Sequence, residues 1–148
     1  MMGMFPLLFL VVLVYAVFAF AGGMIFGSAE VAFNMTTFLD GKFMKFSPPS
    51  GVDWIMSRGD LFLLIGLALL FVEMISSSRS DQRTIINHGL SMGVFVIALL
   101  AFVVKPSFTT STFFLLMIMT LIDVVAGFII TIRVARRDIG FGGNIPGL

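Results

Sequence analysis

Three kinds of residue are scarce or absent in this chain of 148 residues. Cysteine is absent, which excludes disulfide frameworks, thiolate metal sites and cysteine nucleophiles. Histidine occurs once, at His88, so a metal site built from several imidazole ligands is not expected. Charged residues make up only 11% of the chain, against about 25% in a typical soluble domain. With so few charges the surface cannot be solvated by water, and lipid is the expected solvent.

Sequence motifs of common enzymes are missing as well. We find no P-loop, dinucleotide fingerprint, HExxH or GxSxG sequence. The net charge of +1 gives no attraction for nucleic acid. We therefore predict a protein that is not an enzyme, with no catalytic residues, no cofactor, no metal and no nucleic-acid partner.

Long apolar runs are what the sequence does contain. A helix needs about 20 mostly apolar residues to cross a bilayer, and four segments qualify: 5–27, 60–78, 85–104 and 110–132. The first has no lysine or arginine before it and is longer than the ~7–15-residue apolar core of a signal peptide, so we expect it to be retained. Short linkers join the last three segments. The sequence predicts an all-α integral membrane protein, a single antiparallel up-down bundle of four transmembrane helices.

Arginines near the helix ends predict the orientation. Four spans place both termini and the linker 79–84 on one side, and cytoplasmic segments next to spans are rich in arginine and lysine. The arginines on this side are Arg79, Arg83, Arg133, Arg136 and Arg137. We predict cytoplasmic termini, with the tail 133–148 anchored at anionic headgroups; a docking site for another subunit is the alternative.

The long connection 28–59 is predicted to lie on the external side. Its Asp40-Gly41 pair indicates a hairpin turn, and Ser50 or Asp53 is predicted to cap a short helix that presents Trp54. Aromatic rings gather at the headgroup region of membranes. We expect this position for the aromatic residues of the loop, with docking to a partner subunit as the alternative: Phe33, Phe38, Phe43, Phe46 and Trp54.

Small residues recur on one face of several predicted helices. Spacings of four residues let helix backbones approach closely in lipid. The small residues concerned are Ala19, Gly23 and Gly27 in the first segment, Gly66 in the second, Gly89 and Gly93 in the third, and Gly127 in the fourth. We expect these faces to pack within the chain; contacts with another subunit are the alternative.

Ionisable side chains inside the spans are costly and face the bundle interior or a cavity. Glu73 and His88 lie at similar depth on either side of the short linker, roughly 9 and 8 Å from its arginines, so they are predicted to pair. Asp123 is deeper, about 15 Å from Arg133, and Thr120 lies one turn before it. Tyr15 is predicted to reach the depth of Asp123 and to donate to its carboxylate.

Two interpretations of these polar groups remain open. They are either interhelical hydrogen bonds that fix the register of the bundle, which we favour, or a proton or ion relay from the midplane to the cytoplasm.

The segments "GDLFLLIGLALLFVE", "HGLSMGVFVIALLAF" and "TSTFFLLMIMTLIDVVAGFIITIRVARRD" resemble small four-span inner-membrane proteins of bacteria with no assigned activity. The resemblance covers about residues 59–138. It implies a bacterial inner membrane and supplies no functional residues.

The functional prediction follows from what this layout offers. We expect an accessory or structural subunit of a larger membrane-protein complex, with other subunits as partners in preference to further copies of the chain. The alternative is a small oligomeric transporter or channel with a relay through Asp123, Glu73 and His88. A membrane-embedded enzyme or quinone-binding subunit is supported only by His88 and by the aromatic content.

Overall fold

The computed structural model describes residues 6–27, 33–77 and 82–140. Within its helices, the side chains of 77, 82–88, 130–131 and 133–140 lie outside what is described. The elements, in chain order, are α1 Leu7–Phe26, α2 Met35–Asp40, β1 Lys42–Phe46, β2 Trp54–Ser57, α3 Arg58–Ser77, α4 Gln82–Val104, a 3-10 turn η1 Pro106–Phe108, and α5 Ser111–Gly140. The predicted all-α class is confirmed at this level, with one small β-hairpin added.

Three helices are long and apolar enough to cross a membrane. They are Leu7–Phe26, Arg58–Ser76 and Ser111–Ile129. In α4 the described apolar stretch is shorter, Gly89–Val104. In α5 the helix continues past the apolar part to Gly140, so the first half of the predicted tail is helical.

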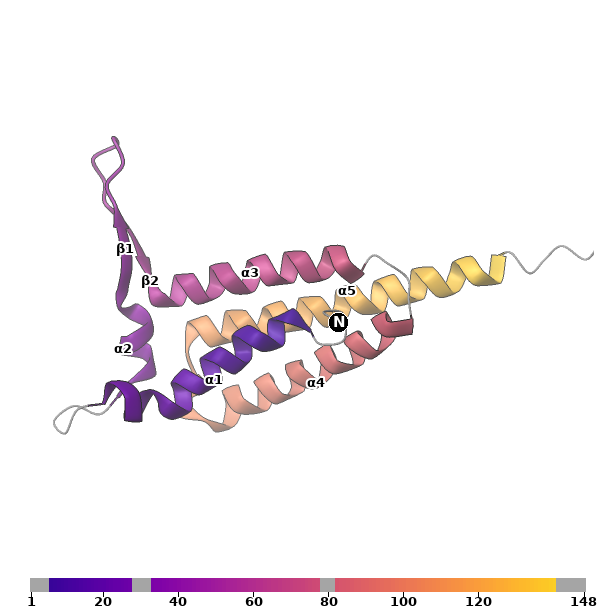
Figure 1. Cartoon of the computed structure of the whole chain (residues 1–148), viewed down its shortest axis with the longest axis horizontal. Helices are drawn as coiled ribbons and strands as arrows, with labels where there is room; N and C mark the ends of the chain where they lie inside the picture. The colour runs from indigo at the N-terminus through magenta and orange to yellow at the C-terminus, as the bar shows by residue number, and fades with distance from the viewer. Residues whose placement is uncertain (1–5, 28–32, 78–81, 141–148) are drawn as a thin grey trace, which may run out of the picture.

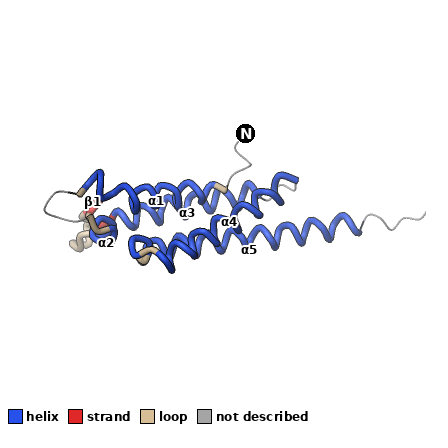
Figure 2. The backbone as a smooth tube through the Cα atoms, turned by 90° about the horizontal axis from the view of Figure 1, so that it is seen from below, coloured by secondary structure: helices blue, strands red, loops and turns tan. Residues whose placement is uncertain are grey.

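Four long helices lie side by side (Figure 1). α1 and α4 run in one direction, and α3 and α5 run in the other. The view turned by a right angle shows the same bundle, with α2 and the β-hairpin at one end (Figure 2). α5 packs against both α3 and α4, and α1 lies mainly against α3. We call the end with α2 and the hairpin the outer end, after the predicted position of the loop 28–59.

The apolar core is concentrated between α1, α4, η1 and the first turns of α5. Its buried members include Val11, Val12, Tyr15, Val94, Ala98, Phe108, Phe113, Leu116 and Met117. By contrast, large apolar side chains are exposed all along the outside of the four long helices. That distribution suits a bundle surrounded by lipid, because lipid tails are as apolar as the side chains they touch.

The glycines divide into packed and open positions. A Cβ added to Gly66 of α3 would lie 2.8 Å from Leu116 Cδ2 and 3.2 Å from Met119 Sδ, so glycine lets α3 approach α5 here. A Cβ at either Gly89 or Gly93 of α4 would meet no atom of the described part of the chain within 4 Å.

The other small residues of the prediction differ in their surroundings. Ala19 is half-buried, Gly127 is buried and Gly23 is exposed. Gly27 ends α1, and its N–H donates to the Gly23 carbonyl. Gly22, which the pattern did not single out, is buried beneath the Phe33 ring.

The prediction for the loop 28–59 was wrong in two details. Asp40-Gly41 does not form a hairpin turn, because the Asn34 side chain accepts from the N–H groups of Thr36 and Thr37 and starts α2, which the Asp-Gly pair then ends. Trp54 stands on β2, not on a short helix. The hairpin turn is at 47–53, where the Gly51 N–H donates to the Pro48 carbonyl and Gly51 adopts φ 79°.

We predict different costs for adding a side chain to the two kinds of glycine. Gly66→Leu is expected to lower the free energy of unfolding by about 1–3 kcal/mol, because Leu116 and Met119 already fill the space. The matched variant Gly93→Leu is expected not to lower it, because the added side chain meets no described atom within 4 Å and replacing a glycine inside a helix raises helix propensity. Denaturant unfolding of the isolated chain in detergent measures both. Equal costs for the two variants would contradict the α3–α5 contact.

Candidate functional site

Tyr15 and Thr110 form a buried polar link between α1 and the start of α5. The two hydroxyl oxygens are 2.6 Å apart, and the Tyr15 hydroxyl also lies 3.4 Å from the Ser107 carbonyl oxygen. Thr110 caps α5, since its hydroxyl accepts from the Phe113 N–H at 3.1 Å. Tyr15 is 0% exposed and its ring contacts Phe62, with Phe113 4.8 Å away between centroids.

The predicted pairing of Tyr15 with Asp123 is not what the structure forms. Asp123 lies thirteen residues beyond Thr110, about 20 Å further along α5. Counting residues from the helix ends assumed that all helices begin at the same level. Instead, α1 begins beside the last two turns of α3 and is displaced toward the outer end.

Glu73 binds the N-terminus of α1. This carboxylate is 3% exposed, and its Oε2 accepts from the Leu8 N–H at 3.3 Å. The first N–H groups of a helix have no partner within it, and Pro6, the residue before α1, has no side chain that can accept. A carboxylate from another helix supplies that acceptor and complements the positive end of the helix dipole. The lack of a capping residue at Pro6 was the sequence signal for this contact, and it was missed.

The side chain of His88, the predicted partner of Glu73, lies outside the described residues. Arg79 lies outside them altogether, as do the side chains of Arg83, Arg133, Arg136 and Arg137.

Asp123 and Glu73 are brought to the same level in the bundle. α3 and α5 run in the same direction, and Gly66 of α3 faces Leu116 of α5. Glu73 follows Gly66 by seven residues, and Asp123 follows Leu116 by seven residues. Seven residues return a helix to nearly the same face. Both carboxylates are buried, and Asp123 is 2% exposed.

Two neutral polar side chains are also buried in this half of the bundle. Ser91 of α4 is one. Thr120 of α5 is the other, and its hydroxyl donates to the Met117 carbonyl of its own helix at 2.7 Å.

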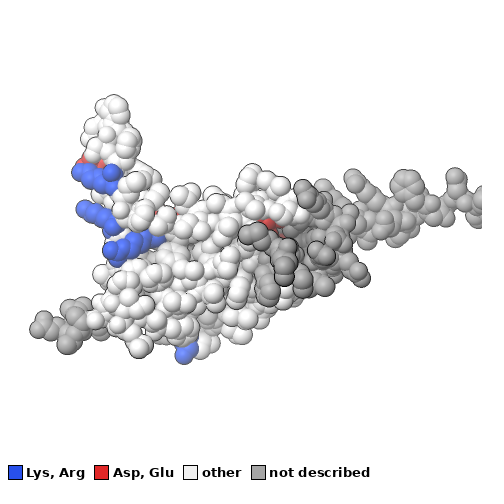
Figure 3. All heavy atoms as spheres, in the orientation of Figure 1, with Lys and Arg blue, Asp and Glu red and all other residues white. Residues whose placement is uncertain are grey.

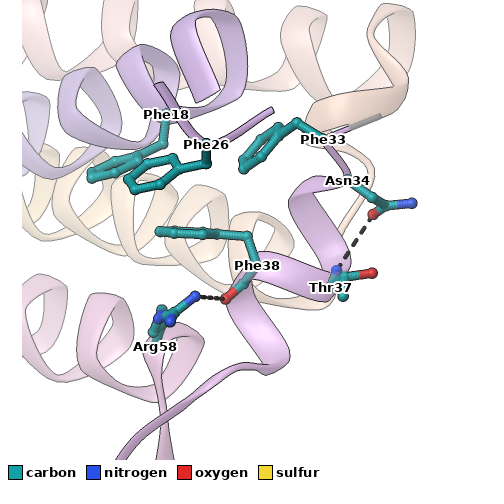
Figure 4. A pocket seen from close by; sticks show the side chains of 7 residues that line it. All are labelled: Phe18, Phe26, Phe33, Asn34, Thr37, Phe38 and Arg58. Atoms are coloured by element: carbon teal, nitrogen blue, oxygen red, sulfur yellow. Dashed lines mark hydrogen bonds between the residues drawn. The ribbon is translucent and has the colours of Figure 1, made fainter. Parts of the chain in front are cut away.

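An aromatic pocket lies at the outer end, where α1, α2 and α3 meet. Its walls include four phenylalanine rings, Phe18, Phe26, Phe33 and Phe38, with centroids 5.2 to 6.2 Å apart along their contacts (Figure 4). Arg58 stands at the rim; its Nη1 donates to the Phe38 carbonyl, and its guanidinium carbon is 4.8 Å from the centroid of the Phe38 ring. The open pocket has a volume of about 540 Å³. These contacts hold α2 against α1 and α3.

The β-hairpin carries a group of charges at the outer end. Lysine and arginine side chains gather on the hairpin and its base (Figure 3). Lys45 Nζ lies 2.7 Å from Asp53 Oδ2, and the Ser47 hydroxyl donates to Asp53 at 2.5 Å. The Lys45 ammonium and the Ser47 hydroxyl hold the pKa of Asp53 below its usual value, so this pair stays charged at neutral pH.

Comparisons of the chain with protein-family models, with curated proteins and with solved structures give no match. Within the described part of the chain, no group of three or more His, Cys, Asp or Glu side chains is placed to hold a metal ion.

The Tyr15–Thr110 link yields a prediction for a double-mutant cycle. Tyr15→Phe removes one partner of a buried hydrogen bond and is expected to cost about 0.5–1.5 kcal/mol of unfolding free energy. Thr110→Val is expected to cost about 2–3 kcal/mol, because it also removes the cap of α5 and leaves the Tyr15 hydroxyl buried without its closest partner. The double variant should cost less than the sum of the two. Strict additivity would show that the two hydroxyls do not interact, and Thr110→Ser serves as the control that keeps the link.

Proposed function

We propose that this chain is a non-enzymatic integral membrane protein of the bacterial inner membrane, an accessory or structural subunit of a larger membrane-protein complex. Three helices long and apolar enough to cross a membrane support the membrane location. The inner membrane is carried by the resemblance of residues 59–138 to small bacterial inner-membrane proteins. We extend the proposal to four spans with cytoplasmic termini, because α4 lies along α5 and because the start of α4 and the end of α5, both opposite the hairpin, carry Arg83, Arg133, Arg136 and Arg137.

The open face of α4 carries the proposal of a partner. Gly89 and Gly93, one turn apart, have no atom of the described residues within 4 Å of an added Cβ. Further along the same face, Ile97 and Leu100 are exposed. In lipid, helices associate by close packing at small residues, and no described part of the chain packs against this pair. A helix of another subunit fits such a face, since its backbone can approach where the two glycines leave space.

The test of this proposal is the composition of the native protein. We expect the chain, purified in mild detergent from its own membrane, to bring other membrane proteins with it in a fixed ratio. The double variant Gly89→Leu/Gly93→Leu is expected to reduce the recovery of partner proteins about tenfold or more. A loss of about 1.4 kcal/mol in packing free energy already weakens binding tenfold. The control is Leu99→Phe, which enlarges an exposed side chain of α4 that points away from this face.

Mass spectrometry of the intact complex measures which proteins are recovered and in what ratio. Recovery of a lone monomer would contradict the proposal, as would unchanged partners in the double glycine variant. A homo-oligomer would favour the second candidate instead.

The second candidate is a small oligomeric transporter or channel with a proton or ion relay through Asp123, Glu73 and His88. One observation favours it, namely that the contact of Gly66 with Leu116 brings Glu73 and Asp123 to one level. Buried carboxylates inside spans mark ion pathways in many membrane proteins.

Asp123→Asn separates the two candidates. If the chain is a structural subunit, we expect ion flux in proteoliposomes to be no greater than in empty vesicles, with or without the substitution. The melting temperature of the variant is expected to fall by several degrees, because a buried hydrogen-bonding group changes. Flux that the wild-type chain supports and that Asp123→Asn abolishes, with assembly unaltered, would favour the relay.

A further inference from the structure

The β-hairpin has two chemically different faces. Residues paired directly across two strands point to the same side of a sheet. Met44 pairs with Met56 and Phe46 with Trp54, and these four residues form what we call the apolar face. Lys45 pairs with Ile55 and therefore points to the opposite side. The hairpin is thus amphipathic across its thickness.

An irregularity in β1 places a second lysine on the opposite side. Lys42 and Met44 are two residues apart and would share a face in a regular strand. Their partners, Ser57 and Met56, are adjacent, so β1 has one extra residue at this point. The bulge turns Lys42 to the side of Lys45, and we call this side the basic face.

The apolar face is uncovered in the described structure. Phe46 is 56% exposed, Trp54 49% and Met44 48%, although all three are side chains that favour burial. A two-stranded hairpin alone is marginally stable in water. An apolar surface that covers this face would stabilise the hairpin.

The direction of the hairpin identifies that surface. It projects from the outer end across the direction of the helices (Figure 1). If α1, α3 and α5 cross a bilayer, the hairpin runs along the membrane surface. Lysine and arginine side chains gather on the side that faces away from the bundle (Figure 3). The apolar face is then turned toward the lipid, and the basic face toward water.

We propose that the hairpin is an interfacial anchor whose apolar face, Met44, Phe46, Trp54 and Met56, inserts into the outer leaflet of the bilayer. Lipid at the boundary between headgroups and acyl chains covers this face. Aromatic side chains concentrate at that boundary, and amphipathic elements are buried there by about 5–10 Å. The inference rests on the proposed membrane location but not on the proposed partner. The anchor fixes the depth of the outer ends of α2 and α3, to which the hairpin is joined directly.

The single tryptophan of the chain makes the test specific, because Trp54 lies on the apolar face and all indole fluorescence comes from it. The full chain is reconstituted at high lipid-to-protein ratio into phosphatidylcholine vesicles with bromine atoms near the headgroup end or near the methyl end of the acyl chains. Bromine near the headgroups is expected to quench Trp54 by about twofold more than bromine near the chain ends, given the expected shallow depth.

A pair of matched variants tests the assignment of the faces. Phe46→Ser, on the apolar face, is expected to reduce the bromolipid quenching by about half and to raise quenching by acrylamide in water, because the hairpin loses part of its buried area. Ile55→Ser, on the basic face, should leave both unchanged. Equal effects of the two substitutions would overturn the assignment of the faces.

The remaining outcomes are distinguishable. A chain that does not float with the vesicles overturns the membrane location and this inference together. A chain that floats, but whose Trp54 is open to acrylamide and not quenched by bromolipid, overturns this inference alone and leaves the apolar face for a partner protein. Trp54 shielded from both quenchers indicates a second copy of the chain on this face and also overturns the inference.

Discussion

The close approach of α3 and α5 at Gly66 is the contact on which the rest of the bundle depends. In lipid, burying an apolar side chain gives little free energy, so helices are held by van der Waals contact and by interhelical hydrogen bonds. Gly66 lets Leu116 fill the space between the helices completely; that side chain is fully buried. This contact sets the register of α3 on α5, and the register places Glu73 and Asp123 at the same level.

α1 is attached to this pair at two points along its length. Near its start, Glu73 of α3 accepts from the Leu8 N–H, and half-way along, Tyr15 reaches Thr110 at the cap of α5. Both contacts satisfy backbone or side-chain groups that lipid would leave without partners. Glu73 and Tyr15 therefore link α1 to α3 and to the start of α5.

The positions of the long helices were readable from the sequence because a helix that crosses lipid needs a long apolar run, and α1 lies within one residue or two of its predicted limits. Three of the four predicted spans are long and apolar enough in the structure, and the described apolar stretch of α4 is shorter. The partners of the polar residues were not readable, since their depths depend on where each helix begins. Pro6 carries no capping group, so α1 takes its acceptor from α3 and is displaced along the bundle. In the outer loop, local turn signals were outweighed by the Asn34 cap and by the Pro48-Pro49 turn.

Cross-linking in membranes measures the α3–α5 register most directly, and the chain suits it because it has no cysteine of its own. Single cysteines are placed at Glu73 on α3 and at Asp123 or Leu116 on α5, and disulfide formation is followed under mild oxidation. The register set at Gly66 predicts that the Glu73→Cys/Asp123→Cys pair cross-links readily, whereas Glu73→Cys/Leu116→Cys, two turns out of level, does not. Efficient cross-linking of the second pair without the first would contradict the register and the arrangement of polar groups built on it.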